Sequence, residues 1–339
     1  MHELIFVGDI AIPNDEGRNI HLPDCLKNKE WVVNLEGAIT DTLHDDAVYN
    51  NTKGFKKLLD AIPIKVASLA NNHIFDIDTL DNTISELQKE KILFLGAGKN
   101  LEEASRHINF GDFLFLNFGW SVIQCPTATK TKRGTNPYKE EHILKSFEEC
   151  KLKFPKKKIV LLFHWNYEME LYPMPRQRDL ALKLIDLGAE IIVGNHSHLV
   201  QGIEKYKDKY ICHGLGNWAF RQGVYHQGKL SFLDSVLDQI AIEYSQNNDL
   251  KIHRFLYNKE NNSVDYIETI SSESDYIKSL TPYAGMSSKE YELFFRKNRL
   301  KTKGLPIYKS KDSKLKIQMK NTYMKFRDLI IKIIFSLRR

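Results

Sequence analysis

Short apolar runs recur along the first two-thirds of the chain, and each ends at a glycine or a polar residue. Five of these runs have the length of a buried β-strand and cover residues 4–7, 31–35, 65–70, 159–163 and 191–193. Between them, residues 55–62 and 80–87 repeat apolar side chains at helical spacing. Because strands alternate with helices, the pattern predicts βαβ units and a largely parallel sheet.

The second half of the chain has a different pattern. Lys207-Asp208-Lys209 separates two apolar segments in the manner of a hairpin turn, and residues 240–244 and 252–257 give further strand signals. Beyond about Asn258 the sequence becomes polar. We therefore predict a catalytic α/β domain over residues 1–258 and an extension over residues 259–339 that is first polar, then basic, and mainly helical.

Residues able to bind a metal stand where the apolar runs end. The carboxyl ends of parallel strands meet at one edge of a sheet, where open α/β sheets hold their sites. Six oxygen or nitrogen donors occupy such positions: Asp9, Glu36, Asn72, His164, His196 and His198. Each of them alone could be a turn, capping or core residue. Their shared position at strand ends predicts one joint metal site.

The mixture of donors narrows the choice of metal. No thiolate is among them, and carboxylate, amide and imidazole groups suit Zn²⁺, Mn²⁺ or Fe²⁺. His196 and His198, one residue apart, can converge on one ion or straddle two neighbouring ions. A carboxylate such as Glu36 can bridge two ions, and ions about 3.5–4 Å apart form a clamp for attack on a phosphate ester. The sequence thus does not decide whether the site holds one ion or two.

Composition narrows the class of protein. Of the 339 residues, 42% are hydrophobic and 11% aromatic, which suits a globular core, and no apolar run reaches the ~18 residues of a membrane span. The amino terminus enters a strand pattern without the segments typical of export, so we expect a cytoplasmic protein. The four cysteines have no paired spacing, and we expect core residues rather than zinc ligands or disulfides.

The positive net charge of +6 arises from the last part of the chain. Residues 301–339 contain twelve Lys or Arg against Asp312 and Asp328, a local balance of +10, so the rest of the chain carries −4. The last part of this segment has the pattern of an amphipathic helix. Its wide apolar face includes Met324, Leu329, Ile330, Ile331, Ile333, Ile334 and Leu337.

Such a basic amphipathic helix has two interpretations. It could lie on the inner, anionic surface of a membrane, or it could dock on the protein's own core or on a second copy. The helical pattern alone favours neither. Because the tail carries +10 and the rest of the chain −4, we predict a cytoplasmic protein held reversibly on the inner membrane surface. The lysines lack the aromatic and glycine pattern of a nucleic-acid-binding module, so we expect no nucleic-acid partner.

Several short motifs resemble those of one protein family. In chain order they are Val7-Gly8-Asp9, Val33-Asn34-Leu35-Glu36-Gly37, Ser68-Leu69-Ala70-Asn71-Asn72-His73 with Asp76, Gly96-Ala97-Gly98, His164-Trp165 with Glu168, Gly194-Asn195-His196-Ser197-His198-Leu199-Val200-Gln201, and Leu215-Gly216-Asn217-Trp218. Over residues 7–220 they look like the CapA family of capsule and poly-γ-glutamate synthesis proteins. That family is a branch of the calcineurin-like metallophosphoesterase superfamily.

The resemblance implies a four-layer α/β/β/α sandwich with metals at the edge of two central sheets. On matching positions the six strand-end donors would be the metal ligands, and His73 would act beside the metals as a general acid or as a hydrogen-bond donor to phosphate. Glu168 has no counterpart in the common phosphatase pattern, and we count it with His73 as a catalytic candidate. Ala11 stands where typical metallophosphatases have a histidine, so one metal site has fewer protein ligands than usual.

The resemblance also implies a function. We expect a metal-dependent hydrolase, most plausibly a phosphoesterase, that acts on an anionic polymer or a phosphorylated precursor in capsule or other surface-polymer biosynthesis, poly-γ-glutamate or polysaccharide. It would use one or two divalent ions (Mn, Zn or Fe). The alternative is a non-hydrolytic accessory subunit of a polymer synthase, which keeps a metal for structure or polymer binding. The absent histidine at position 11 favours that alternative.

Overall fold

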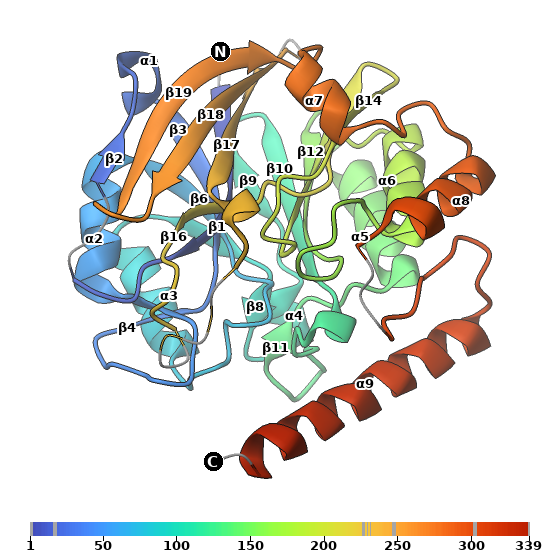
Figure 1. The fold of residues 1–339 in the computed structure, drawn as a ribbon, viewed down its shortest axis with the longest axis horizontal. Helices are drawn as coiled ribbons and strands as arrows, with labels where there is room; N and C mark the ends of the chain where they lie inside the picture. The colour runs from blue at the N-terminus through green and yellow to red at the C-terminus, as the bar shows by residue number, and fades with distance from the viewer. Residues whose placement is uncertain are drawn as a thin grey trace.

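Two β-sheets packed face to face form the centre of the molecule (Figure 1). The computed structural model describes residues 3–15, 19–225, 228, 230, 232–245, 249–300 and 304–337, without the side chains of residues 332 and 334–337. The apolar layer between the sheets joins Phe6 and Val32 of one sheet to Phe115 and Leu162 of the other. Burial of this layer is the main force that holds the two sheets together.

The first sheet has the strand order β2-β19-β18-β17-β1-β3-β6-β7, and β16 pairs with β1. The strands β1, β3, β6 and β7 are parallel, as the sequence predicts, whereas β17, β18 and β19 are antiparallel. Their bounds are β1 Glu3–Ala11, β2 Asn19–His21, β3 Glu30–Leu35, β6 Ile64–Ser68, β7 Leu93–Leu95, β16 Asn217–Phe220, β17 Asp238–Ser245, β18 Leu250–Asn258 and β19 Ser263–Ser271.

The second sheet has the order β14-β15-β13-β12-β10-β9. Its strands β10, β12, β13 and β15 are parallel, and β14 and β15 form the antiparallel hairpin predicted around Lys207 and Asp208. The bounds are β9 Ile108–Phe110, β10 Phe113–Gly119, β12 Lys158–His164, β13 Ile191–Asn195, β14 Ile203–Tyr206 and β15 Lys209–Cys212. Short elements complete the core: α1 Asp24–Lys27, β4 Ala38–Thr40, β5 Tyr49–Asn51, β8 Ala97–Gly98, α4 Leu101–Ala104, η1 Ser121–Ile123, β11 Gly134–Thr135 and η2 Asp234–Val236.

Helices cover the outer face of each sheet. On the first sheet, α2 (Thr52–Ala61) and α3 (Leu80–Lys89) pack apolar side chains such as Phe55 and Leu87 against the strands. On the second, α5 (Glu140–Lys153) and α6 (Pro175–Asp186) do the same. These layers confirm the predicted α/β/β/α architecture.

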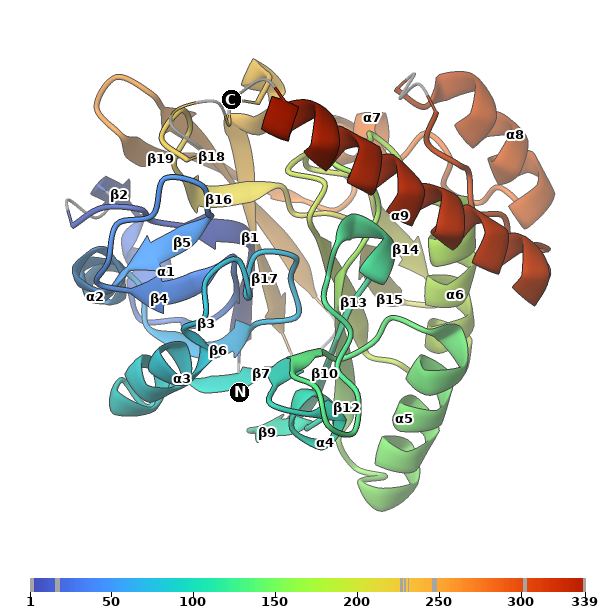
Figure 2. The ribbon, with the colours of Figure 1, turned by 90° about the horizontal axis from the view of Figure 1, so that it is seen from below.

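The C-terminal extension is mainly helical. Strand β19, beyond the predicted boundary at residue 258, still continues the first sheet. Helices α7 (Asp275–Leu280), α8 (Ser288–Asn298) and α9 (Lys314–Leu337) follow, and Figure 2 shows α9 lying diagonally across one face of the molecule. Within the described ranges, no helix combines the length and apolar character required to cross a membrane.

A close approach between the backbones of β1 and the segment before β16 fixes the end of β1 that carries Asp9. A Cβ atom on Gly8 would lie 1.9 Å from the carbonyl oxygen of Gly216, so only glycine allows β1 and β16 to run this close. A hydrogen bond of 2.9 Å from the amide of Asp9 to the Gly216 carbonyl stabilises this approach. It brings Asp9 level with Asn217.

A buried ion pair ties α6 to β14. Arg178 donates from Nε and Nη2 to the two carboxylate oxygens of Glu204 at 2.9 and 2.5 Å, and His213 Nε2 lies 3.4 Å from Glu204 Oε2. These partners offset the desolvation of Glu204 and hold its pKa at about 2, below its ordinary value of 4.5. Because the folded state holds the carboxylate ionised more strongly than the unfolded state does, the pair stabilises the fold above pH 4.5.

This shift predicts a specific pH dependence of stability. As the pH falls from about 4.5 to about 2, the contribution of Glu204 should disappear, and the free energy of unfolding should decrease. Glu204→Gln should lack this part of the dependence, and at neutral pH it should lose roughly 3–5 kcal/mol because Arg178 stays buried without its partner. Urea titrations at several pH values measure both effects. A Gln variant with unchanged stability and pH profile would contradict the assignment.

Candidate metal centre

The six predicted ligands meet at the carboxyl ends of parallel strands from both sheets. Asp9 lies in β1, Glu36 directly follows β3, and Asn72 follows β6. His164 ends β12 in the second sheet, and His196 and His198 follow β13. All the parallel strands point the same way toward this edge, so residues far apart in the chain become neighbours. The joint site expected from the sequence is thus a compact cluster in the structure.

Asp9 is fully buried and held from two directions. Its Oδ1 accepts a hydrogen bond of 2.7 Å from the Asn34 side-chain amide, and its Oδ2 accepts one of 3.1 Å from the backbone amide of His196. The Nδ1 atom of His198 lies 3.4 Å from the same Oδ2. Burial raises the pKa of Asp9, and the nearby His198 partly offsets that rise. The carboxylate is therefore locked in position before any ion binds.

Glu36 is the centre of the cluster. It is fully buried, and among the described residues neither carboxylate oxygen has a hydrogen-bond partner. Burial, followed by the neighbouring carboxylates of Asp9, Glu168 and Asp76, raises its pKa well above the ordinary value. Two groups of potential ligand atoms, each within 4.8 Å of one another, share Glu36: one contains His164 and His196, and the other contains Asp9 and His198.

The imidazoles are prepared to act as neutral ligands. Burial, followed by the neighbouring histidines, holds the pKa of both His164 and His196 well below the ordinary value, so both rings are neutral at pH 7. His164 Nε2 lies 2.7 Å from Oδ1 of Asn72, and its ring centroid is 4.8 Å from that of His196. The Nδ1 atom of His196 has no hydrogen-bond partner among the described residues.

The backbone turns sharply after β13 to present two histidines. His196 and His198 have φ values of +96° and +58°, a left-handed region that residues with a Cβ atom rarely adopt. Contacts hold His198 in place, because its Nδ1 lies 2.7 Å from Oδ1 of Asn217 and its ring packs on Phe232 at a centroid distance of 4.3 Å. Such strain at a cluster of chemically reactive groups is typical of functional sites.

The two catalytic candidates lie at the mouth of the cluster. His73 Nδ1 lies 2.7 Å from Oδ2 of Asp76, and its Nε2 is 3.8 Å from Glu36 Oε1. Glu168 is exposed and stands outside both groups of potential ligands. Together with Asn72 and His196, these residues line an open cleft of about 610 Å³. The cleft gives a substrate access to the buried donors.

Three residues of the site were not predicted in their observed roles. Asn34 links Asp9 to His164 by contacts of 2.7 and 3.5 Å, Asn217 orients His198, and Asp76 orients His73. The signal for Asn34 was present, because an amide inside an otherwise apolar strand requires a buried partner. The pairings themselves depend on which strands are neighbours, and one sequence does not contain that information.

The donors fit a divalent cation. A buried glutamate without hydrogen bonds is costly, and a second carboxylate beside it adds repulsion. A cation among Glu36, Asp9 and the neutral imidazoles would remove both penalties and would give the unpartnered Nδ1 of His196 a role. Oxygen and imidazole donors without thiolate match Mn²⁺, Zn²⁺ or Fe²⁺. The cluster can therefore hold a metal.

The layers of the structure are those of the metallophosphoesterase-type α/β fold. Comparison with known proteins identifies the branch. A family model described as bacterial capsule synthesis protein PGA_cap matches residues 22–222, more than half of the chain. The chain belongs to this family of CapA-like capsule synthesis proteins, as its motifs had indicated.

Similarity to individual proteins supports the assignment to this family. The chain is 30% identical over 221 residues to the capsule biosynthesis protein CapA of Bacillus anthracis, covering 60% of this chain and 53% of the relative. It is 31% identical over 174 residues to the PGA biosynthesis protein CapA of Bacillus subtilis, covering 49% and 45%. A probable polyglutamine synthesis accessory protein of Mycobacterium tuberculosis is 25% identical over 216 residues, covering 57% and 54%. The chain thus spans about half the length of these relatives.

Metal binding should stabilise the protein measurably. At about 100 times its dissociation constant, Mn²⁺ or Zn²⁺ should raise the free energy of unfolding by about 2.7 kcal/mol and increase Tm accordingly. His196→Ala should lose most of this gain, whereas His21→Ala, at a side chain that is 66% exposed and remote from the cluster, should keep it. Thermal unfolding with elemental analysis of the dialysed protein measures both. If neither ion stabilises or remains bound to the wild type, the cluster is not a metal site.

Proposed function

We propose that the chain is a metal-dependent hydrolase of phosphate esters that acts in the biosynthesis of capsule or a related surface polymer. The observation that carries the proposal is the buried, unpartnered Glu36 shared by two groups of donors beneath an open cleft. Asp9, Glu36, Asn72, His164, His196 and His198 would hold one or two ions. Bound divalent ions supply Lewis-acid polarisation of a phosphoryl oxygen and a nucleophile at neutral pH. The names of the relatives support the biosynthetic context.

The remaining side chains at the cleft have roles that follow from their contacts. Asp76 accepts the Nδ1 proton of His73 and fixes the direction of the ring. The Nε2 atom of a doubly protonated His73 would then donate its proton to the oxygen of the leaving group. Glu168, exposed at the same mouth, would bind an entering substrate or exchange protons with it.

Substitution of single donors tests whether the protein is a metal-dependent hydrolase. Asn72→Ala and His196→Ala should reduce metal-dependent turnover of phosphate esters at least a hundredfold, because each removes a donor from the cluster. His73→Ala should reduce turnover by roughly 10²–10⁴-fold while metal stays bound, as expected of a general acid. Asn109→Ala, at an exposed position in β9, is the matched control. Unchanged turnover in Asn72→Ala and His196→Ala would refute the assignment.

A second function is supported by one specific position. Ala11, buried at the end of β1, provides no donor where typical metallophosphatases have a histidine. A reduced ligand set suits a non-hydrolytic accessory subunit that binds metal and polymer beside a synthase. The Mycobacterium tuberculosis relative is named a probable polyglutamine synthesis accessory protein. Metal analysis combined with a screen of phosphate mono- and diesters separates the two functions. Bound metal without hydrolysis of any ester would favour the accessory subunit.

We also propose that the protein works at a membrane surface, held there by α9. Large apolar side chains of this helix remain exposed on its outward face: Leu315, Met319, Tyr323, Phe326, Leu329, Ile330 and Ile333. We call these residues the outer stripe. Contiguous exposed apolar surface of this kind usually marks an interaction site. The side chains of Ile334 and Leu337, expected to belong to the same face, lie outside the described residues.

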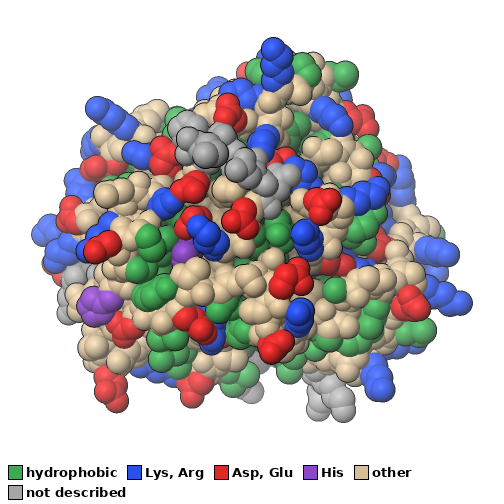
Figure 3. Space-filling model, turned by 90° about the horizontal axis from the view of Figure 1, so that it is seen from above, with side chains coloured by type: hydrophobic (Ala, Val, Ile, Leu, Met, Phe, Trp, Pro, Cys, Tyr) green, Lys and Arg blue, Asp and Glu red, His purple; other side chains and the backbone are tan. Residues whose placement is uncertain are grey.

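Charge favours an anionic surface as the partner of the outer stripe. Helix α9 carries six Lys or Arg and one Asp, so two copies packed stripe to stripe would repel each other. Figure 3 views the molecule from the side opposite α9, where acidic and basic side chains are intermingled. An apolar stripe with flanking cations is the arrangement of helices that lie in the interface of an anionic bilayer.

Vesicle binding tests this location. The wild type should sediment with phosphatidylglycerol vesicles, and added salt should weaken binding because charge attraction is screened within ~8 Å at physiological ionic strength. Replacing Phe326 and Ile330 with Ser should weaken binding at least tenfold, since both side chains would enter the lipid. Leu152→Ser, at a residue of α5 that is 83% exposed, removes exposed apolar surface elsewhere and should not change vesicle binding. Equal binding by all three proteins, or by none, would contradict the proposal.

A further inference from the structure

The inward face of α9 forms one wall of the cleft above the metal centre. Met324, Arg327 and Asp328 line the same cleft as His73 and His196, although more than 120 residues separate the two groups in the chain. Leu305, in the segment that leads to α9, lines this wall as well. A substrate that reaches the buried donors therefore passes along α9.

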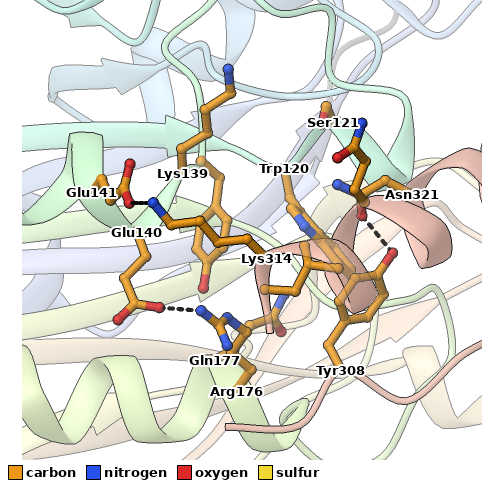
Figure 4. Close-up of a pocket in the computed structure, with 13 residues that line it drawn as sticks. Trp120, Ser121, Lys139, Glu140, Glu141, Arg176, Gln177, Tyr308, Lys314 and Asn321 are labelled. Atoms are coloured by element: carbon orange, nitrogen blue, oxygen red, sulfur yellow. Dashed lines mark hydrogen bonds and ion pairs between the residues drawn. The ribbon is translucent and has the colours of Figure 1, made fainter. Parts of the chain in front are cut away.

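Defined contacts hold α9 in this position. Met324 is buried with an exposed fraction of 3%, and the Tyr308 hydroxyl donates a hydrogen bond of 2.8 Å to Oδ1 of Asn321. Figure 4 shows this bond together with the ion pair between Lys314 and Glu141, at a cavity of about 320 Å³ between α9 and the core. The helix is thus attached at both its first turn and its middle, and Arg327 follows one turn after Met324.

Arg327 is unusual among the residues of the cleft. Of the described residues that line the cleft, Arg327 is the only lysine or arginine, whereas four lining residues carry carboxylates: Asp46, Asp76, Glu168 and Asp328. Its closest carboxylate in the described part of the chain is that of Asp328, at 3.7 Å, which is too long for a hydrogen bond. The guanidinium is only partly exposed, with 35% of its side-chain surface accessible.

An arginine in this state is equipped to bind an anion. Its planar group presents five N–H donors in a fixed fork that matches a carboxylate or a phosphate in bidentate geometry. Partial burial strengthens such a bond, because fewer water molecules compete. The surrounding carboxylates would repel an anion everywhere else at the mouth of the cleft. They would thereby confine an anionic group to the position of Arg327.

We propose that Arg327 recognises an anionic group, carboxylate or phosphate, that the substrate carries at a distance from the bond placed at the metal centre. The substrate class is therefore an ester with a second negative charge, as in an acidic polymer or its activated precursor. This inference rests on the proposed function, since it assumes that the cleft receives a substrate. It assigns α9 to the binding site as the wall that selects the substrate.

A matched set of substrates tests the proposal. The first is an aryl phosphodiester whose alkyl arm ends in a carboxylate, the second is the methyl ester of that carboxylate, which keeps only the charge of the phosphodiester, and the third carries a terminal phosphate instead. For the two compounds with a second negative charge, Arg327→Ala should raise KM on the order of ten- to hundredfold and leave kcat unchanged. The KM and kcat of the methyl ester should not change. Arg327→Lys should recover part of the loss. Lys325→Ala, at an exposed lysine on the same helix, should match the wild type.

The three compounds together show whether Arg327 recognises an anionic group and which anion it prefers. A loss confined to the carboxylate or to the phosphate compound identifies the preferred anion. Equal effects of Arg327→Ala on the compounds with and without the second charge, or no effect on any, would overturn the inference. Equilibrium binding of the carboxylate compound to the metal-loaded protein is the second measurement. If the wild type hydrolyses nothing, the proposed hydrolase fails, yet weaker binding by Arg327→Ala than by Lys325→Ala would still support the role of Arg327, and equal binding would refute it.

Discussion

The structure of the site depends on one constraint, the burial of two carboxylates side by side. Asp9 and Glu36 are both fully buried, and Asp9 contributes to the raised pKa of Glu36. Asp9 accepts two hydrogen bonds, whereas Glu36 accepts none among the described residues. A fold selected for stability alone would place apolar side chains here, because an unpartnered buried carboxylate is costly. A positively charged ligand held between these carboxylates and the surrounding histidines would offset this cost.

The sandwich provides the precision that such a cluster requires. Ladder hydrogen bonds fix the ends of β1, β3, β12 and β13 relative to one another, and the apolar layer between the sheets fixes one sheet against the other. The approach of β1 to β16 at Gly8 and Gly216 then aligns Asp9 with Asn217, which in turn holds His198. Each ligand is positioned by the rigid part of the fold, and the strained turn after β13 adds His196 and His198 together.

Much of this arrangement was predictable, and the rest was not, for physical reasons. Period and length of the apolar runs predicted the strands, and polar residues at their ends predicted all six donors, because strand-end position is a local property of the sequence. Asn34, Asn217 and the pairing of Asp76 with His73 depend on which strands and loops become neighbours, which is a tertiary property. Asp76 precedes α3, whose N-cap residue is Thr79, and its carboxylate serves His73 instead.

Helix α9 shows why an amphipathic pattern alone could not decide between two interpretations. The segment has apolar residues on two faces: Met324 is buried against the core, while Phe326 and Ile330 of the outer stripe are exposed. Docking on the core therefore buries only part of the apolar surface of the helix and leaves the rest exposed. Arg327 lies on the inward side and lines the cleft. One helix thus lines the cleft with one face and leaves the outer stripe exposed on the other, so a partner bound at the outer stripe would lie on the same helix that lines the candidate metal centre.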